Sequence, residues 1–142
     1  MGFVTRNTYY FDSPGAENTH DAAHFAVERA QELGIKKIVV ASTTGRTALL
    51  FRDAMKGTGL ELIVVTHVVG FSKPGEWEFS PEAAAALRAD GVKIVTGTHA
   101  LSGLERAISR SQRLGGSSRT EAIAEALRRI VAVGLKVAVE CV

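Results

Sequence analysis

Apolar and polar residues follow two different rhythms along the chain. Short apolar runs bounded by turn residues predict strands at residues 4–11, 37–41, 61–66 and 93–97. Apolar residues three and four positions apart predict helices at about residues 19–33, 45–55, 81–90 and 118–131, and another beginning at residue 102. A last apolar element covers residues 134–142. Strands that alternate with helices indicate an α/β domain with a mostly parallel sheet and right-handed crossovers.

Polar residues mark the ends of several predicted elements. Ser80, Pro81 and Glu82 form a strong helix start, with a capping hydroxyl, a proline and an acidic first turn. Ser118 and Glu121 have the spacing of a capping box. The strand at residues 61–66 has a Leu-Ile-Val-Val centre, which is typical of a strand buried on both faces.

The strand end at residues 38–50 is the most informative stretch for function. An apolar run gives way to Ser42, Thr43, Thr44 and Gly45, and a helical pattern begins at once. Hydroxyls and unpaired backbone N–H groups then meet at the positive end of a helix dipole, an arrangement that suits an anion. An ordinary capped turn between strand and helix is the alternative. The loop has neither the Walker spacing nor the Gly-x-Gly-x-x-Gly pattern.

Ligands of parallel sheets bind beyond the carboxyl ends of the strands. Three segments with small and hydroxyl residues meet there, at residues 42–47, 66–71 and 96–106. His99 follows the last predicted strand and is a candidate donor to a ligand, with a hydrogen bond inside its own loop as the alternative. Arg106 suits either a phosphate or a salt bridge with Glu105 or Glu17.

The longest irregular segment covers residues 67–79. Loops of this length inside a compact domain are usually functional or mobile. We therefore predict that the segment covers the site and is partly packed before a ligand arrives. Its Phe71, Trp77 and Phe79 suit either stacking on a ligand ring or packing on the core.

Composition narrows the class of protein. The 142 residues suit one domain, and 46% hydrophobic and 23% charged residues are ordinary for a globular chain. A net charge of +2 without a longer basic run argues against nucleic acid as a partner. The apolar runs are too short for a membrane helix, and no signal peptide follows Met1, so a cytoplasmic location is expected.

The sequence also argues against a metal site and against hydrolysis. Cys141 is the single cysteine, which excludes an internal disulfide and a cysteine-based zinc site. His20 and His24 are four residues apart but lack a third ligand, so we interpret them as a solvated helix face. Ser102 near His99 has no acid to orient the imidazole, and no catalytic triad is visible.

A set of motifs over most of the chain resembles the pyruvate kinase C-terminal domain, and more particularly stand-alone proteins with that fold. The loop at residues 42–48 (Ser-Thr-Thr-Gly-Arg-Thr-Ala) resembles the effector phosphate loop of that domain. The other landmarks are residues 14–19, Gly70 and Phe71, residues 98–106, residues 116–122 and residues 134–137.

The resemblance implies a three-layer α/β/α sandwich that binds flavin mononucleotide (FMN) without an assigned activity. It also implies that pyruvate kinase activity is absent, because the catalytic domains are not in this sequence, and that C-terminal elements usual in the family are missing after Val142. The expected FMN-binding residues are Ser42, Thr43, Thr44, Gly45, Thr47, Thr66, Gly70, Phe71, His99, Leu101, Ser102, Gly103 and Arg106.

Three functions remain open at this point. The first is a binding protein for a phosphorylated small molecule, with FMN expected, and the second is a flavin-dependent oxidoreductase. The third is a regulatory module that binds a sugar phosphate. A homo-oligomer is compatible with each of them.

Overall fold

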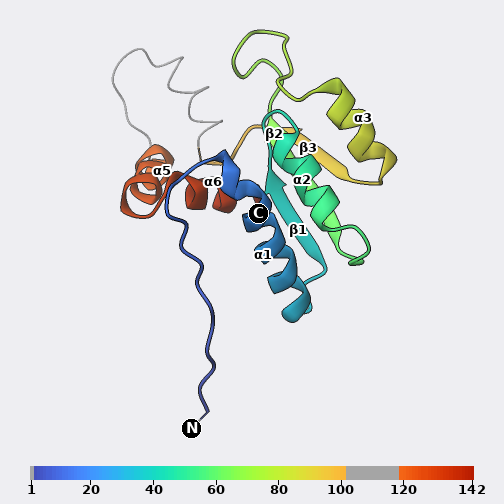
Figure 1. Ribbon diagram of the computed structural model, residues 1–142. Coiled ribbons are helices and arrows are strands. Elements are labelled where there is room, and N and C mark those ends of the chain that lie inside the picture. Colours follow the sequence, from blue (N-terminus) through green and yellow to red (C-terminus); the bar gives the residue numbers. More distant parts are fainter. Residues whose placement is uncertain (1, 102–118) are drawn as a thin grey trace.

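The computed structural model of the chain describes residues 2–101 and 119–142. Its centre is a parallel sheet of β1 (Lys37–Ala41), β2 (Glu61–His67) and β3 (Lys93–Gly97), in the order β1-β2-β3 (Figure 1). Ala41 pairs with Val65, and His67 pairs with Gly97. The carboxyl ends of all three strands therefore meet at one edge of the sheet.

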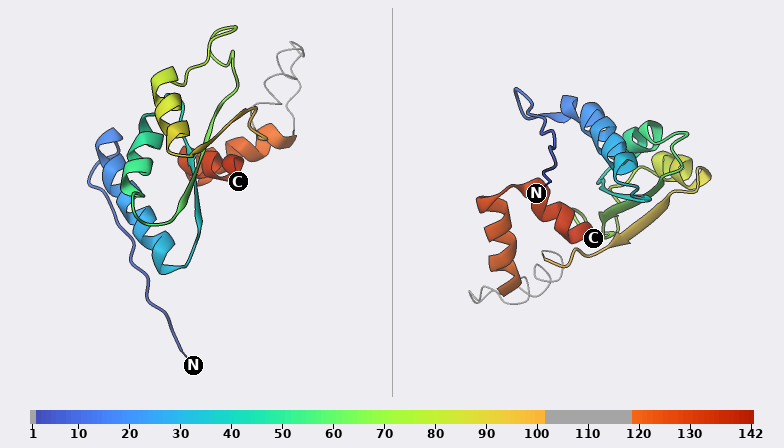
Figure 2. Two further views of the ribbon diagram at one scale, coloured as in Figure 1. Left: turned by 90° about the vertical axis from the view of Figure 1, so that its right-hand side faces the viewer. Right: turned by 90° about the horizontal axis from the view of Figure 1, so that it is seen from below.

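Helices lie on both sides of this sheet. The first group is α1 (Thr19–Glu32), α2 (Arg46–Ala54) and α3 (Pro81–Ala89), with a short 3-10 helix, Ala16–Asn18, before α1. The second group is α5 (Arg119–Ile130) and α6 (Val133–Cys141), on the opposite side of the sheet (Figure 2). The expected α/β sandwich with a parallel sheet is confirmed.

The core lies between the sheet and the first group of helices. Val64, Phe79 and Leu87 are fully buried there. Ser80 caps α3 as predicted, because its Oγ accepts a hydrogen bond from the Ala83 N–H at 3.1 Å. The predicted strands at residues 37–41 and 93–97 are confirmed with their boundaries. The bounds of the predicted helices within the described residues differ from the observed bounds by a few residues.

The two faces of the sheet are buried to different degrees. Leu62, Val64 and Thr66 of β2 are buried, whereas Ile63 and Val65 on the other face are only half-buried. The expectation that this strand is buried on both faces is therefore correct for one face only. The short α6 contacts β1 but does not extend over the whole sheet.

The predicted strand at residues 4–11 is wrong. These residues are exposed and have no strand partner in the described part of the chain. Their aromatic side chains make ring contacts instead, since the Tyr9 ring stacks on Phe25 of α1 with 3.9 Å between the centroids. A strand needs a neighbouring ladder for its N–H and C=O groups, and apolar composition alone does not supply one.

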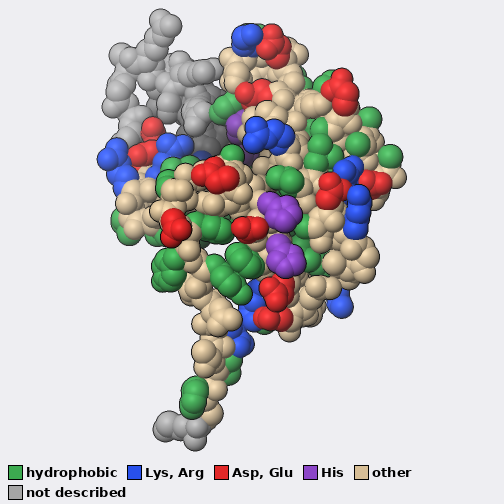
Figure 3. Space-filling model, in the orientation of Figure 1, with side chains coloured by type: hydrophobic (Ala, Val, Ile, Leu, Met, Phe, Trp, Pro, Cys, Tyr) green, Lys and Arg blue, Asp and Glu red, His purple; other side chains and the backbone are tan. Residues whose placement is uncertain are grey.

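The surface carries both acidic and basic side chains, as expected for a net charge of +2 (Figure 3). Acidic and basic side chains alternate over the face in Figure 3, with apolar side chains gathered near the extended N-terminal segment. No helix in residues 2–101 and 119–142 is both long and apolar enough to cross a membrane. The element expected at residues 134–142 is the helix α6, and the helix expected from residue 102 lies outside the described residues.

Candidate functional site

A cavity of about 510 Å³ opens at the carboxyl ends of the strands. It combines the ends of β1 and β2, the starts of α1 and α2, the segment after β3, and the inner sides of α5 and α6. The lining residues are Ala16, Thr19, Ala41, Ser42, Thr43, Thr44, Arg46, Thr47, Val65, Thr66, His67, Phe71, His99, Arg128, Lys136, Val137 and Glu140.

The loop after β1 begins with a serine that stabilises the loop itself. The Ser42 side chain is buried, and its Oγ accepts hydrogen bonds from the N–H groups of Gly45 at 3.1 Å and Ala48 at 3.4 Å. For Ser42, the structure therefore agrees with the alternative interpretation of the loop, an ordinary capped turn between strand and helix. Thr43 and Thr44 are exposed at the cavity and Thr47 is half-buried, so three hydroxyls remain there.

Gly45 faces the core and does not line the cavity. Its φ of +98° is in the left-handed region. A Cβ at this position would lie 2.7 Å from the Ala83 Cβ and 3.1 Å from the Phe79 ring. The glycine thus allows close packing against α3, which corrects the expectation that Gly45 is an FMN-binding residue. The Ser80 N–H also donates to the Thr44 carbonyl at 3.1 Å and ties the loop to α3.

Thr66 connects the ends of the first two strands. Its side chain is buried, and its Oγ1 donates a hydrogen bond of 3.5 Å to the Thr43 carbonyl. One residue later, His67 enters the cavity wall. The two adjacent strand ends are therefore fixed relative to each other beside the threonine loop.

His67 is held by a carboxylate and an aromatic ring. Its Nδ1 lies 3.0 Å from Glu78 Oε2, and its ring stacks on Phe71 with 3.9 Å between the centroids. Ser72 Oγ donates to the other oxygen of Glu78 at 2.5 Å. The Ser72 hydroxyl and His67 together lower the pKa of Glu78 below its ordinary value.

His99 lies next to His67 but in a more enclosed place. The two ring centroids are 5.2 Å apart, and the His99 side chain is 14% exposed. Its Nδ1 is 3.6 Å from Glu140 Oε2, while its Nε2 is buried without a hydrogen-bond partner among the described residues. Burial lowers the pKa of His99 below its ordinary value, against the opposing effect of Glu140.

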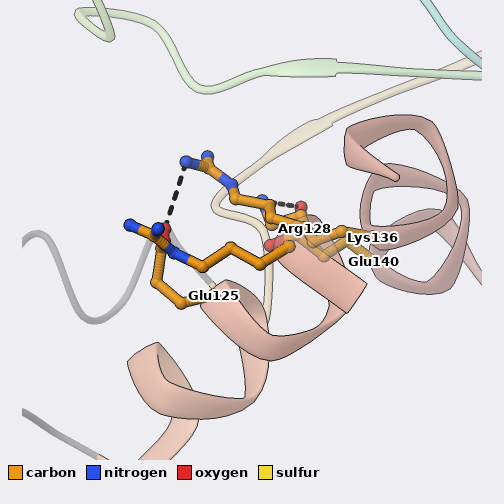
Figure 4. A network of polar contacts seen from close by, with 5 residues as sticks. Glu125, Arg128, Lys136 and Glu140 are labelled. Carbon is orange, nitrogen blue, oxygen red and sulfur yellow. Dashed lines mark hydrogen bonds and ion pairs between the residues drawn. The ribbon is translucent and has the colours of Figure 1, made fainter. Parts of the chain in front are cut away.

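Cationic side chains reach the cavity from α2, α5 and α6. Lys136 is almost fully buried and pairs with the buried carboxylate of Glu140, one helical turn further along α6 (Figure 4). Arg128 of α5 donates to Glu125 at 3.3 Å. Arg46, at the start of α2, is exposed and has no carboxylate partner in the part of the chain that the structure describes.

These cationic residues were absent from our expected binding set. Lys136 and Glu140 had a usable signal, because two ionisable residues four positions apart interrupt an apolar stretch. Arg46 directly follows the Ser-Thr-Thr-Gly loop. Arg128 had no such signal, since α5 also carries other charged residues.

The segment at residues 67–79 is held by its own hydrogen bonds. The Gly70 N–H donates to the Glu76 carbonyl at 2.8 Å, and the Glu76 N–H donates to the Lys73 carbonyl at 3.1 Å. Trp77 stacks on Phe79 with 5.3 Å between the centroids and packs against the core, whereas Phe71 lines the cavity. Of Phe71, Trp77 and Phe79, only Phe71 therefore contributes to the cavity wall.

The remaining predicted residues have different positions. Gly70 adopts a φ of +84° in a turn of the same segment, and neither Gly70 nor the half-buried Leu101 lines the cavity. Ser102, Gly103 and Arg106 lie outside the described residues. Within the described ranges, no group of three or more His, Cys, Asp or Glu side chains is placed to hold a metal ion.

The site thus combines the start of α2, the hydroxyls of the threonine loop, two arginines, the Lys136–Glu140 pair and two histidines at the edge of a parallel sheet. Such a site suits an anionic small molecule, with donors toward the charge and ring faces beside it. In a comparison with known families, the family model of the pyruvate kinase alpha/beta domain matches residues 20–140. The chain belongs to the family of the pyruvate kinase alpha/beta domain.

Proposed function

We propose that the cavity binds a phosphorylated small molecule with an aromatic ring, and that FMN is this ligand. The observation that carries the proposal is the convergence of Arg46 and Arg128 on one cavity that also contains the start of α2, while the charge of Lys136 is balanced by Glu140. Two guanidinium groups at one concave site favour an anion, because the cavity walls limit screening by water.

The phosphate is expected at the loop after β1. The hydroxyls of Thr43, Thr44 and Thr47 face the cavity there, and the N–H groups of Arg46 and Thr47 at the start of α2 have no acceptor within the helix, whereas that of Ala48 donates to Ser42. Arg46 adds a guanidinium without a competing carboxylate among the residues described. Charge-assisted hydrogen bonds of this kind are the strong ones.

The ring is expected beside the ends of β2 and β3. Phe71, Val65 and Val137 provide apolar surface in the cavity wall, and His67 provides a flat polar side chain. A volume of about 510 Å³ is in the range of small-molecule sites. A phosphorylated ligand with a planar ring matches both the threonine loop with Arg46 and the apolar surface beside His67.

Fluorescence titration of the protein with FMN tests the proposal. Thr43→Ala combined with Thr44→Ala is expected to weaken binding at least about tenfold, because each lost hydrogen bond to a charged group costs roughly 1.5–3 kcal/mol. Arg46→Gln is expected to weaken it as well. Lys93→Gln removes one positive charge at the amino end of β3 and is the matched control, with unchanged affinity expected.

Absence of FMN binding by the folded wild-type protein would refute the FMN assignment. Equal affinity of the Thr43→Ala/Thr44→Ala variant would move the phosphate away from this loop. Fructose bisphosphate is the competitor that distinguishes a sugar-phosphate site, since it has two phosphates and no ring to stack on Phe71. Anaerobic reduction of the bound flavin by a nicotinamide cofactor distinguishes an oxidoreductase from a carrier.

A further inference from the structure

His67 differs from an ordinary loop histidine in how its two ring nitrogens are used. Nδ1 faces the carboxylate of Glu78 at 3.0 Å, and Ser72 fixes that carboxylate from the other side. Nε2 has no hydrogen-bond partner among the described residues, and the side chain is 26% exposed in the cavity wall. A carboxylate at Nδ1 fixes the ring orientation, stabilises the imidazolium, and leaves Nε2 for a ligand.

His67 also lies beside the loop that carries the cavity's hydroxyls. Ala41 and Val65 are paired in the sheet, and each is followed two residues later by a cavity residue: Thr43 in the loop after β1, and His67 at the end of β2. The hydrogen bond from Thr66 to the Thr43 carbonyl keeps these two strand ends together. An anion at the threonine loop therefore lies next to the strand end that carries His67.

Charged groups from every neighbouring element bear on the protonation of His67. The negative charge of Glu78 favours a protonated His67, and so does that of Glu140 on α6, which lies on the far side of His99. The positive charges of Arg46 on α2, Arg128 on α5 and Lys136 on α6 oppose protonation of His67. An entering dianion adds negative charge to this set and shifts the balance toward the protonated ring.

His99 is a poorer group for the same role. It is less exposed than His67, and burial lowers its pKa, which favours the neutral ring. Its Nε2 is buried, so it does not reach a ligand in the cavity without rearrangement. His67 is thus the histidine of the pair that can exchange a proton as a ligand binds.

We propose that His67, oriented by Glu78, is a titrating ligand contact: a phosphate-bearing ligand binds together with a proton taken up at Nε2 of His67, which then donates to the anion. The inference rests on the proposed function, because it requires an anion in this cavity. It assigns to His67 and Glu78 a preference for a dianionic ligand over a neutral analogue.

Calorimetric titration with FMN at pH 7.5, in two buffers of different ionisation enthalpy, tests the proposal. A phosphate monoester has a second pKa of about 6 and is mostly dianionic at this pH, so proton uptake reports on the protein. The observed enthalpies are expected to differ, with uptake of a substantial part of one proton. Between pH 7 and pH 8.5 the affinity is expected to fall, by at most about tenfold per pH unit for one proton.

Variants assign the proton to one histidine. His67→Gln is expected to abolish the uptake, and Glu78→Gln to reduce it, because an amide does not stabilise the imidazolium by charge. His99→Gln is expected to retain it, and His24→Gln, on the exposed side of α1, is the matched control for loss of a histidine. Riboflavin, which lacks the phosphate, is expected to bind more weakly and without uptake.

Nuclear magnetic resonance of the histidine rings in the wild-type protein gives a measurement free of mutation. The His67 ring signals at pH 7.5 are expected to move toward those of the protonated ring on addition of FMN, because a bound anion stabilises the imidazolium. Equal enthalpies in the two buffers, unmoved His67 ring signals, or full uptake in folded His67→Gln would overturn the proposal. Failure of FMN to bind at all would refute the proposed function, and this inference with it.

Discussion

The role of Gly45 gives the sharpest test of how the candidate site is built. Its backbone has a φ of +98°, and a Cβ would lie 2.7 Å from the Ala83 Cβ and 3.1 Å from the Phe79 ring. Gly45→Ala therefore combines two costs. A left-handed backbone costs an L-residue roughly 1–2 kcal/mol, and overpacking against a buried helix costs roughly 1–3 kcal/mol.

The summed loss is about 2–5 kcal/mol, a large share of the roughly 5–15 kcal/mol that stabilises a typical domain. Urea unfolding followed by circular dichroism measures it. Gly34→Ala is the matched control, because Gly34 has a φ of +67° and a Cβ there would meet nothing within 4 Å. Only the backbone cost is expected for the control, which isolates the steric part as the difference.

A double-mutant cycle separates packing from other causes. Ala83→Gly removes the nearest atom, so it is expected to recover part of the loss when combined with Gly45→Ala, although Ala83→Gly alone costs a helix about 1 kcal/mol. Folded Gly45→Ala should still bind FMN, since the added methyl points toward α3. Equal stability of Gly45→Ala and Gly34→Ala would refute the packing argument, and lost binding in a folded Gly45→Ala protein would return the glycine to the ligand site.

Three further predictions concern the cavity walls. Lys136→Met is expected to lower the free energy of unfolding by about 3–5 kcal/mol, because it removes the ammonium beside the buried Glu140 carboxylate, and adding Glu140→Leu should recover most of this loss in urea titrations. Because the folded pKa of His99 is lowered, its contribution to stability is complete above the ordinary pKa of 6.5 and is lost as the pH falls below it. Urea midpoints from pH 7.5 to pH 5 should therefore decline less steeply in His99→Gln than in the wild type. FMN is expected to slow cleavage after Glu76 by a glutamate-specific protease only moderately, since this segment is already internally bonded; identical cleavage rates with and without FMN would mean that the segment is no lid.

The sequence was a good guide where local pattern decides the structure. The apolar runs at residues 37–41 and 93–97 became strands with the predicted bounds, because both are flanked by strong helix and turn signals. The rule that parallel strands end at one edge brought Thr43, Thr66 and His99 into one cavity. Neither inference needed knowledge of long-range packing.

Features that depend on distant neighbours were not predictable in the same way. Residues 4–11 have the composition of a strand, but pairing depends on an adjacent edge elsewhere in the chain. Gly45 has a neighbour in α3 that no local pattern reveals, and Trp77 packs on the core instead of the site. Arg128 reaches the cavity because α5 packs against α6, which in turn contacts β1.

The pair of Lys136 and Glu140 connects the energetics of the fold with the chemistry of the cavity. Both side chains are almost fully buried in a helix that is otherwise apolar. Removal of two charges from water costs several kcal/mol for each ion, and their mutual attraction seldom exceeds this cost, so apolar residues would stabilise α6 at least as well. The stability of the helix therefore gives no reason for a lysine at this position. The place of the pair in the wall of a cavity that also contains Arg46 and the threonine loop gives one: the pair is neutral by itself, and an anion bound on the Lys136 side gives this poorly screened cation a second partner.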